Sequence, residues 1–171
     1  MSNYLKIIRK NLSNPAILIR YSTLLFIAGL VEIKEIENFY EKFMGVLDYK
    51  PYKIEFNKRP EYLYVYVSGE EDSLDISRQF WQEIAEDCGR IKCGKILIVE
   101  GIKQSVTITE MYQIASEIPQ MGFFGTKIAF VDCYIEHQNI NDFGEIVATN
   151  RGIYGKIFND VAEAEKWLLS N

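Results

Sequence analysis

Two carboxylates follow apolar runs that are typical of buried strands. Glu100 ends the run Lys95–Glu100, and Asp132 ends the run Lys127–Asp132. In an open α/β sheet, the crevice beyond the carboxyl ends of the strands is the usual place for a ligand. As a pair, these carboxylates could bind a cation or an amine, or serve as acid and base in an enzyme. The alternative is that each one starts a turn or contacts a helix N-terminus.

Apolar and cationic side chains in loops form a second group of candidates. The loop Met121–Gly125 holds Phe123 and Phe124 between two glycines, a composition typical of a mobile flap over a hydrophobic pocket. Together with Ile102, these phenylalanines would line or gate such a pocket. The alternative is that one phenylalanine plugs the core while the glycines turn the chain. Arg151, at a predicted helix C-terminus, either interacts with the helix dipole or contacts an anionic headgroup.

Other residue types that carry chemistry are scarce. His137 is the single histidine, and its polar surroundings predict that it is exposed to solvent. The cysteines lack the paired C-x-x-C spacing of zinc sites and favour a reduced, cytoplasmic setting. The sequence has no glycine-rich phosphate loop and no nucleophile elbow. We therefore expect no catalytic residue, no metal and no cofactor. The cysteines are Cys88, Cys93 and Cys133.

The charge balance limits the classes of partner. The chain has 171 residues, of which 48% are hydrophobic, enough to bury a core. Residues 49–171 hold 13 Lys and Arg against 19 Asp and Glu. Binding to nucleic acid depends on a basic face that neutralises phosphates. We therefore expect no nucleic acid among the partners.

Hydrophobic periodicity assigns residues 49–171 to strands and helices of one α/β domain. Alternation over Tyr52–Phe56 and Tyr62–Ser68 predicts an antiparallel pair, and three short strands follow at 95–100, 127–132 and 155–158. A helix begins at Asp72 or Ser73, and another begins with the capping box Thr107–Glu110. Two more helices begin near 139–141 and at 160. The apolar face expected for the second helix consists of Ile108, Met111, Tyr112, Ala115 and Ile118.

Residues 1–48 form a separate, helical N-terminal extension. Basic residues precede an apolar segment over 16–31. The uninterrupted apolar part of this segment is too short to cross a bilayer of roughly 30 Å. An amphipathic stripe then runs over 31–47. One interpretation packs this extension on the domain or on a partner, a second copy of the chain included. The other interpretation is peripheral attachment to a membrane surface.

The segments from about Tyr52 to Leu169 resemble the bacterial SpoIIAA-like family, whose fold is related to STAS and CRAL-TRIO domains. The resemblance implies a STAS-like mixed β-sheet with helices, and it does not cover residues 1–48. The segments that carry it are Tyr62–Gly69, Phe80–Trp81, Lys95–Glu100, Lys127–Asp132, Phe143–Gly152 and Val161–Leu168.

The resemblance also suggests a regulatory site. Sporulation antagonists similar to this family are phosphorylated on a serine within an Asp-Ser-Ser/Thr-Gly motif at the start of a helix. The matching loop here is Glu100–Thr107, which lacks that motif. Ser105 is near the equivalent position, so it is either a phosphorylation site or an ordinary loop serine.

Three functional hypotheses follow. The first is a non-enzymatic, cytoplasmic STAS-like module that binds an apolar, lipid-like molecule or a protein partner, with or without membrane contact. The second is a partner switch controlled by phosphorylation at Ser105. The third is an enzyme that uses Glu100 and Asp132 as acid and base.

Overall fold

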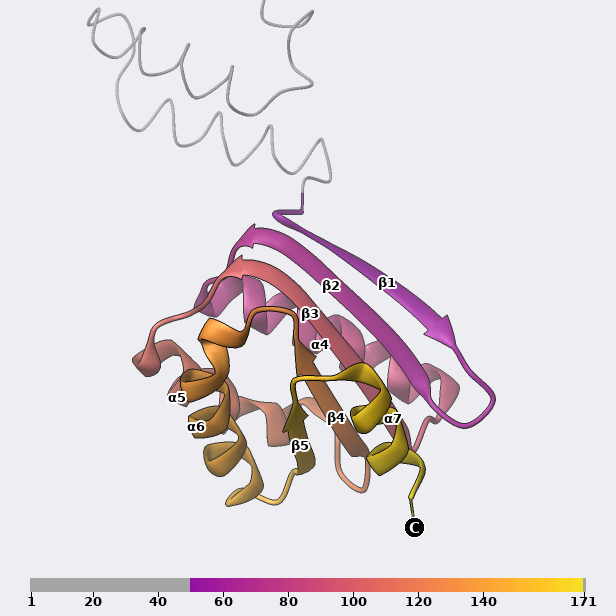
Figure 1. The fold of residues 1–171 in the computed structure, drawn as a ribbon. Coiled ribbons are helices and arrows are strands. Elements are labelled where there is room, and N and C mark those ends of the chain that lie inside the picture. The colour runs from indigo at the N-terminus through magenta and orange to yellow at the C-terminus, as the bar shows by residue number, and fades with distance from the viewer. Residues whose placement is uncertain (1–49, 171) are drawn as a thin grey trace, which may run out of the picture. The chain divides into compact units, whose positions relative to one another are not determined.

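The computed structural model describes residues 50–170. The chain divides into two units, 1–49 and 50–171. The helical extension expected over residues 1–48 lies outside the described residues. Figure 1 shows the second unit as a sheet flanked by helices on both faces.

One five-stranded sheet forms the centre of this unit. Its strands are β1 (Tyr52–Lys58), β2 (Leu63–Glu71), β3 (Lys95–Gln104), β4 (Lys127–Asp132) and β5 (Tyr154–Phe158). They lie side by side in chain order, with β1 antiparallel to β2 and the other pairs parallel. The α/β class and the mixed sheet expected from the sequence are therefore confirmed.

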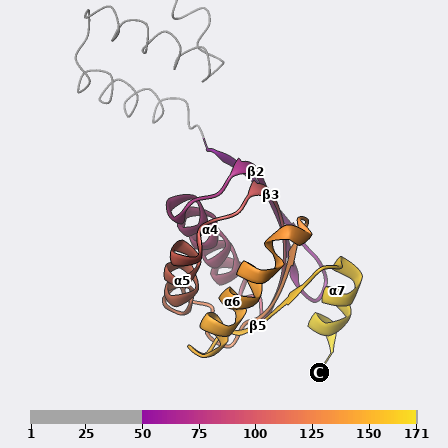
Figure 2. The ribbon, with the colours of Figure 1, turned by 60° about the vertical axis from the view of Figure 1, so that its left-hand side comes forward.

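Four α-helices cover the sheet unequally. The crossover helices are α4 (Leu74–Ile91), α5 (Ile108–Glu117) and α6 (Gln138–Thr149), and α7 (Val161–Leu169) follows the last strand. Parallel crossovers are right-handed, so an unbroken strand order puts all three crossover helices on one face. Figure 2 shows α4, α5 and α6 on that face and α7 on the other.

Local capping explains where the helices begin. Ser73 accepts a hydrogen bond from Ile76 N at the start of α4, and Asp160 accepts one from Glu163 N at the start of α7. The capping box predicted at Thr107 is present, because Glu110 and Thr107 each bind the other's backbone N–H.

The predicted buried face of α5 is partly wrong. Ile108 and Tyr112 are 56% and 49% exposed, whereas Ile114 is buried. The helix lies between the sheet and solvent, and α4 and α6 flank it, so only a narrow stripe reaches the core. That stripe is centred on Ala115 rather than on Met111–Tyr112.

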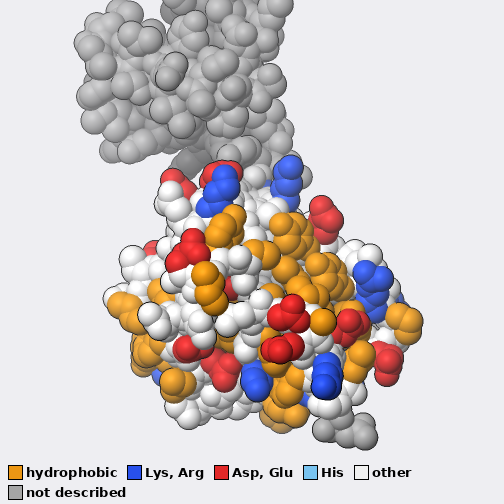
Figure 3. Space-filling view, viewed as in Figure 1, with side chains coloured by type: hydrophobic (Ala, Val, Ile, Leu, Met, Phe, Trp, Pro, Cys, Tyr) orange, Lys and Arg blue, Asp and Glu red, His pale blue; other side chains and the backbone are white. Residues whose placement is uncertain are grey.

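The sheet separates two cores of different size. The larger lies between the sheet and α4, α5 and α6, and it contains Phe80, Trp81 and Phe123. The smaller lies under α7 and contains Leu97 and Leu168. Figure 3 shows hydrophobic side chains gathered beside α7, over the part of the sheet that this helix leaves open. Half-buried tyrosines packed against the smaller core are Tyr62, Tyr64 and Tyr66.

The cysteines differ from the expected reduced set. Cys88, in the last turns of α4, forms a disulfide with Cys93 in the loop that leads to β3. Cys133 is free and exposed. The two bonded residues are five positions apart, a spacing that the helix end closes by bringing their Cα atoms to 5.2 Å. No local pattern in the sequence indicates this pairing, because it depends on where α4 ends.

Candidate functional site

Three carboxyl side chains lie close together on β3, on β4 and just after β2. Asp72 follows β2, Glu100 lies within β3, and Asp132 is the last residue of β4. Glu100 and Asp132 are direct neighbours across the β3–β4 pair. The sequence predicted that Glu100 ends its strand, but β3 continues to Gln104 because it stays paired with β2. Glu100 points, like Ile98 two residues before it, into the larger core.

Asp132 is held by three contacts. Its Oδ1 accepts a hydrogen bond from Tyr134 N at 2.8 Å. Its Oδ2 accepts one from Asn141 Nδ2 at 2.8 Å and lies 2.9 Å from His137 Nδ1. His137 is buried, so the expectation that it is exposed is wrong. A short 3-10 turn (Ile135–His137) before α6 folds the imidazole back toward the carboxylate.

Asp72 occupies the turn that leads into α4. Its carboxylate accepts hydrogen bonds from Ser73 N and Ser77 Oγ, both at 2.7 Å. Burial nevertheless raises the pKa of Asp72 from 3.8 to about 6, with smaller contributions from Glu110 and Asp132. The sequence suggested only a favourable charge at a helix start for Asp72, which misses its proximity to the other two carboxyls.

Glu100 differs from both of these residues because no residue in the described part of the chain donates a hydrogen bond to its carboxyl. The side chain is 8% exposed, and no hydrogen-bond donor from residues 50–170 reaches it. Burial raises the pKa of Glu100 well above its ordinary value, and the nearby Asp72 and Asp132 raise it further. Free energy is lost when a polar group is buried without a partner, so this arrangement indicates a group kept for binding or chemistry.

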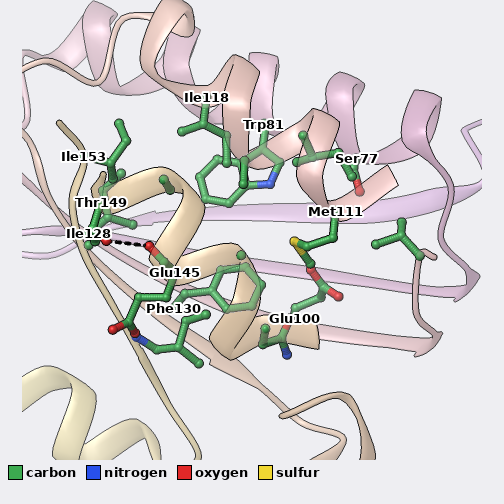
Figure 4. A pocket seen from close by; sticks show the side chains of 18 of the residues that line it. Ser77, Trp81, Glu100, Met111, Ile118, Ile128, Phe130, Glu145, Thr149 and Ile153 are labelled. Carbon is green, nitrogen blue, oxygen red and sulfur yellow. Dashed lines mark hydrogen bonds between the residues drawn. The ribbon is translucent and has the colours of Figure 1, made fainter. Parts of the chain in front are cut away.

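A cavity of about 90 Å³ adjoins Glu100. It lies between the sheet and the three crossover helices, and its walls are mostly apolar. In Figure 4, Ser77, Met111 and Glu100 stand at one end, while Ile128, Thr149 and Ile153 stand at the other. Further residues that line it are Asp72, Phe80, Ser105, Ala115, Asn141 and Ala148.

Stacked aromatic rings shape the middle of this cavity. Trp81 from α4 and Phe130 from β4 lie nearly parallel, with ring centroids 6.1 Å apart. Gly144 lets α6 approach α5, because a Cβ there would come within 2.6 Å of Met111 Sδ. These residues were expected in helix and strand cores rather than in a site. Periodicity predicts a buried face but gives no indication of where that face leaves space.

The structure does not bring all the sequence candidates together. Of the six proposed ligand-binding residues, only Glu100 lines the cavity. Ile102 is fully buried, and Phe123 packs edge-on against Trp81 as part of the core. Phe124 is 97% exposed on the other side of the turn.

The remaining candidates also have identifiable contacts. Arg151 donates a hydrogen bond from Nη1 to Val147 O at the end of α6, and from Nη2 to Tyr112 Oη. This is the helix C-terminal contact that the sequence offered as one of two interpretations. Ser105 is half-buried and lines the cavity.

Neither a metal site nor a membrane span is found in the described part of the chain. Within residues 50–170, no group of three or more His, Cys, Asp or Glu side chains is arranged to hold a metal ion. None of the helices there is both long and apolar enough to cross a membrane.

Comparisons with known proteins find similarity in structure. No family model matches the chain, and no curated protein matches it. One of the similar solved structures is an uncharacterized DUF3478-family protein from Shewanella loihica PV-4, described as having a SpoIIAA-like fold. The match has a TM-score of 0.44 and 12% sequence identity, and it covers 68% of this chain and 93% of that protein. SpoIIAA-like is also the fold that the sequence segments resemble.

Proposed function

We propose that this chain is a non-enzymatic binding module that takes a small molecule with an apolar body into the cavity between the sheet and α4, α5 and α6. The observation that carries the proposal is the cavity itself, which has mostly apolar walls and a carboxyl, Glu100, that lacks a hydrogen-bond partner among residues 50–170. Ligand sites in proteins commonly combine such walls with a few polar groups that fix orientation.

The cavity favours a ligand smaller than a lipid. Its volume of about 90 Å³ corresponds to about six to nine water-sized groups, if each takes roughly 10–15 Å³. A long acyl chain exceeds that space unless the helices move apart. We therefore replace the lipid-like ligand expected from the sequence with a compact molecule, such as a substituted benzene ring or a short alkyl chain.

The enzyme hypothesis has less support from the geometry. Acid and base must both reach the reacting atoms. Glu100 lines the cavity, but Asp132 does not, and its oxygens are already engaged by Tyr134, His137 and Asn141. The proposed pair therefore does not face a common space.

The phosphorylation switch also has less support. A phosphate on Ser105 would lie near the start of α5, where the Glu110 carboxylate already binds Thr107 N at 2.9 Å. Asp72 and Glu100 line the same cavity as Ser105. Added negative charge would meet repulsion from these groups rather than a free helix N-terminus.

A cavity-filling variant tests the binding proposal. Ala148 lies in α6 and lines the cavity, so Ala148→Leu should occupy part of the ligand's space. Ala162 is exposed on α7, and Ala162→Leu is the matched control. Full-length protein would be titrated with benzyl alcohol, with thermal unfolding and calorimetry as readouts.

The two variants should respond differently. We expect benzyl alcohol to raise the unfolding temperature of the wild type and of Ala162→Leu, but to leave Ala148→Leu unchanged. Native mass spectrometry of freshly purified protein would show whether a small molecule stays bound. Equal responses from all three proteins, or from none of them, would contradict binding in this cavity.

A further inference from the structure

The polar end of the cavity is rich in hydrogen-bond acceptors. Ser77 Oγ and one N–H of Asn141 Nδ2 donate hydrogen bonds to Asp72 and Asp132. The Ser77 lone pairs and the Asn141 carbonyl oxygen remain as acceptors. Glu100 adds a carboxyl to which no described residue donates a hydrogen bond. A ligand that carries several donors therefore fits this end.

Acidic groups gather at the same end. Asp72, Glu100 and Asp132 converge there, and Glu110 is close enough to affect Asp72. Within residues 50–170, the one basic side chain within ion-pair distance of any of these four carboxyls is His137, which lies against Asp132. Glu100 is more than nine-tenths buried and lines the cavity without a hydrogen-bond partner among the described residues. An anionic ligand would be disfavoured beside these carboxyls, whereas a cation would stabilise their ionised form.

The composition of the cavity walls favours an organic cation over a metal ion as the ligand. A hard metal ion requires several oxygen ligands at short distance, and the described residues form no such group. The walls beyond the polar end are apolar and aromatic, with Trp81 and Phe130 stacked across the middle. Aromatic faces attract organic cations and pack well against apolar groups.

We propose that the cavity binds a small primary amine with an apolar body, whose ammonium group is held by Glu100 and Asp72. The inference rests on the binding function proposed above and specifies its ligand class. The three N–H donors of an ammonium match the acceptors of the polar end. The body of the ligand lies against Met111, Trp81 and Phe130.

Three probes of similar shape and different charge separate the contribution of charge to binding from that of shape. Benzylamine, benzyl alcohol and benzoate share a benzene ring and differ in the polar group. Their binding to full-length protein would be measured by calorimetry at pH 7.5. Because a hydrogen bond to a charged group is stronger than a neutral one, benzylamine should bind roughly ten- to a hundredfold more tightly than benzyl alcohol. Benzoate should bind more weakly than either.

The variant Glu100→Gln tests whether the Glu100 carboxylate binds the ammonium group. It keeps the shape of the side chain and removes the ionisable group, so the ratio of benzylamine affinity to benzyl alcohol affinity should fall toward one.

Amine binding should also release a proton from Glu100, seen as a heat that depends on the ionisation enthalpy of the buffer. That dependence should disappear in Glu100→Gln. Asp72→Asn should weaken the binding of benzylamine more than the binding of benzyl alcohol.

Each result bears on one of the two proposals. If benzyl alcohol binds the wild type as tightly as benzylamine does, the amine inference is wrong and cavity binding stands. Unchanged benzylamine affinity in Glu100→Gln would also overturn it. If Ala148→Leu and the wild type give the same result with every probe, binding in the cavity is wrong, and the amine inference falls with it.

Discussion

Glu100 is the residue on which the interpretation of this domain depends. A glutamate in the middle of a central strand, facing a core of Ile96, Ile98 and Ile102, raises the free energy of the folded state. Three nearby polar residues do not compensate for it, because they bind Asp72 and Asp132 instead. A burial cost of this kind is common where a side chain must meet a ligand.

The buried carboxyls should make the domain less stable as pH rises. Asp72 has a pKa of about 6 in the folded state, against 3.8 ordinarily, and the pKa of Glu100 is also raised. A group whose folded pKa is raised stabilises the fold at low pH, and that stability is lost as pH rises through the folded value. Asp72 alone accounts for about 3 kcal/mol, at roughly 1.36 kcal/mol per pH unit.

Urea unfolding at several pH values measures this dependence. We expect the free energy of unfolding to fall as pH rises from about 4 to 8, with the part that comes from Asp72 nearly complete by about pH 6 and any further fall due to Glu100. Glu110 and Glu117 have lowered pKa values, so their opposite effect is confined to more acidic solutions. A free energy that rises over this range would contradict the burial of Asp72 and Glu100.

Glu100→Gln should stabilise the protein at pH 8. At pH 8 the carboxyl is ionised in the unfolded chain, so folding must either protonate it or bury its charge; the amide avoids this cost, and we expect a gain of about 1–3 kcal/mol. At pH 4.5 the carboxyl is protonated, and wild type and variant should be nearly equal. Glu136→Gln, at an exposed position, is the control and should change stability at neither pH. A loss of stability at pH 8 would show that Glu100 has a favourable partner.

At the scale of secondary structure, Lys127 connects β4 to α7. The lysine is buried, and its Nζ donates hydrogen bonds to Trp167 O at 2.7 Å and Ser170 O at 2.8 Å. It also lies 4.5 Å from the centre of the Trp167 ring. A cation at a helix C-terminus is favoured by the helix dipole, and here it anchors α7 on the smaller core.

Lys127→Met should loosen α7. Loss of the charged hydrogen bonds is expected to lower the free energy of unfolding by about 1.5–3 kcal/mol, measured in urea. Lys95 occupies the neighbouring position on β3, so Lys95→Met is the matched control. Faster hydrogen exchange in 161–169 should accompany the change in Lys127→Met alone. Equal effects in the two variants would contradict a specific role for Lys127 as an anchor.

At the scale of the whole molecule, the disulfide fixes the end of α4 to the loop that leads into β3, the strand that carries Glu100. A loop this short is expected to contribute about 2 kcal/mol when closed. Without reductant, an alkylating reagent applied to the denatured protein should label only Cys133, since Cys88 and Cys93 are bonded. After reduction it should label all three, and the unfolding temperature should fall. Labelling of all three without reductant would contradict the disulfide.

The arrangement of layers explains why the cavity lies where it does. Three crossover helices pack on one face of the sheet, and their side chains must fill the space between α4, α5 and α6 above β3 and β4. Small residues at Gly144, Ala115 and Ala148 draw the helices close but leave room in front of Glu100. No single helix encloses this space, so the cavity forms only when all three helices are packed on the sheet.

Much of the architecture could be predicted from the sequence because it depends on local patterns. Alternation of apolar residues marked β2, the short apolar runs marked β3 and β4, and the Thr107 capping box marked the start of α5. These signals come from residues within a few positions of one another. They also indicated that Glu100 and Asp132 would be neighbours, since parallel strands end at the same edge of a sheet.

Only the tertiary structure determines the site, because the burial and the hydrogen bonds of its side chains depend on residues that are distant in sequence. Asp72 and Asn141 are separated from Glu100 by whole elements, and only the packed layer brings them to one cavity. His137 was expected in solvent and is instead buried against Asp132, because a 3-10 turn reverses the chain. Phe123 is buried in the core and Phe124 is exposed. The sequence of the loop did not indicate which of the two would be buried. The sequence by itself determined which helices and strands form. The cavity between them, and the position of the Glu100 carboxyl in its wall, depend on how three helices pack on one sheet.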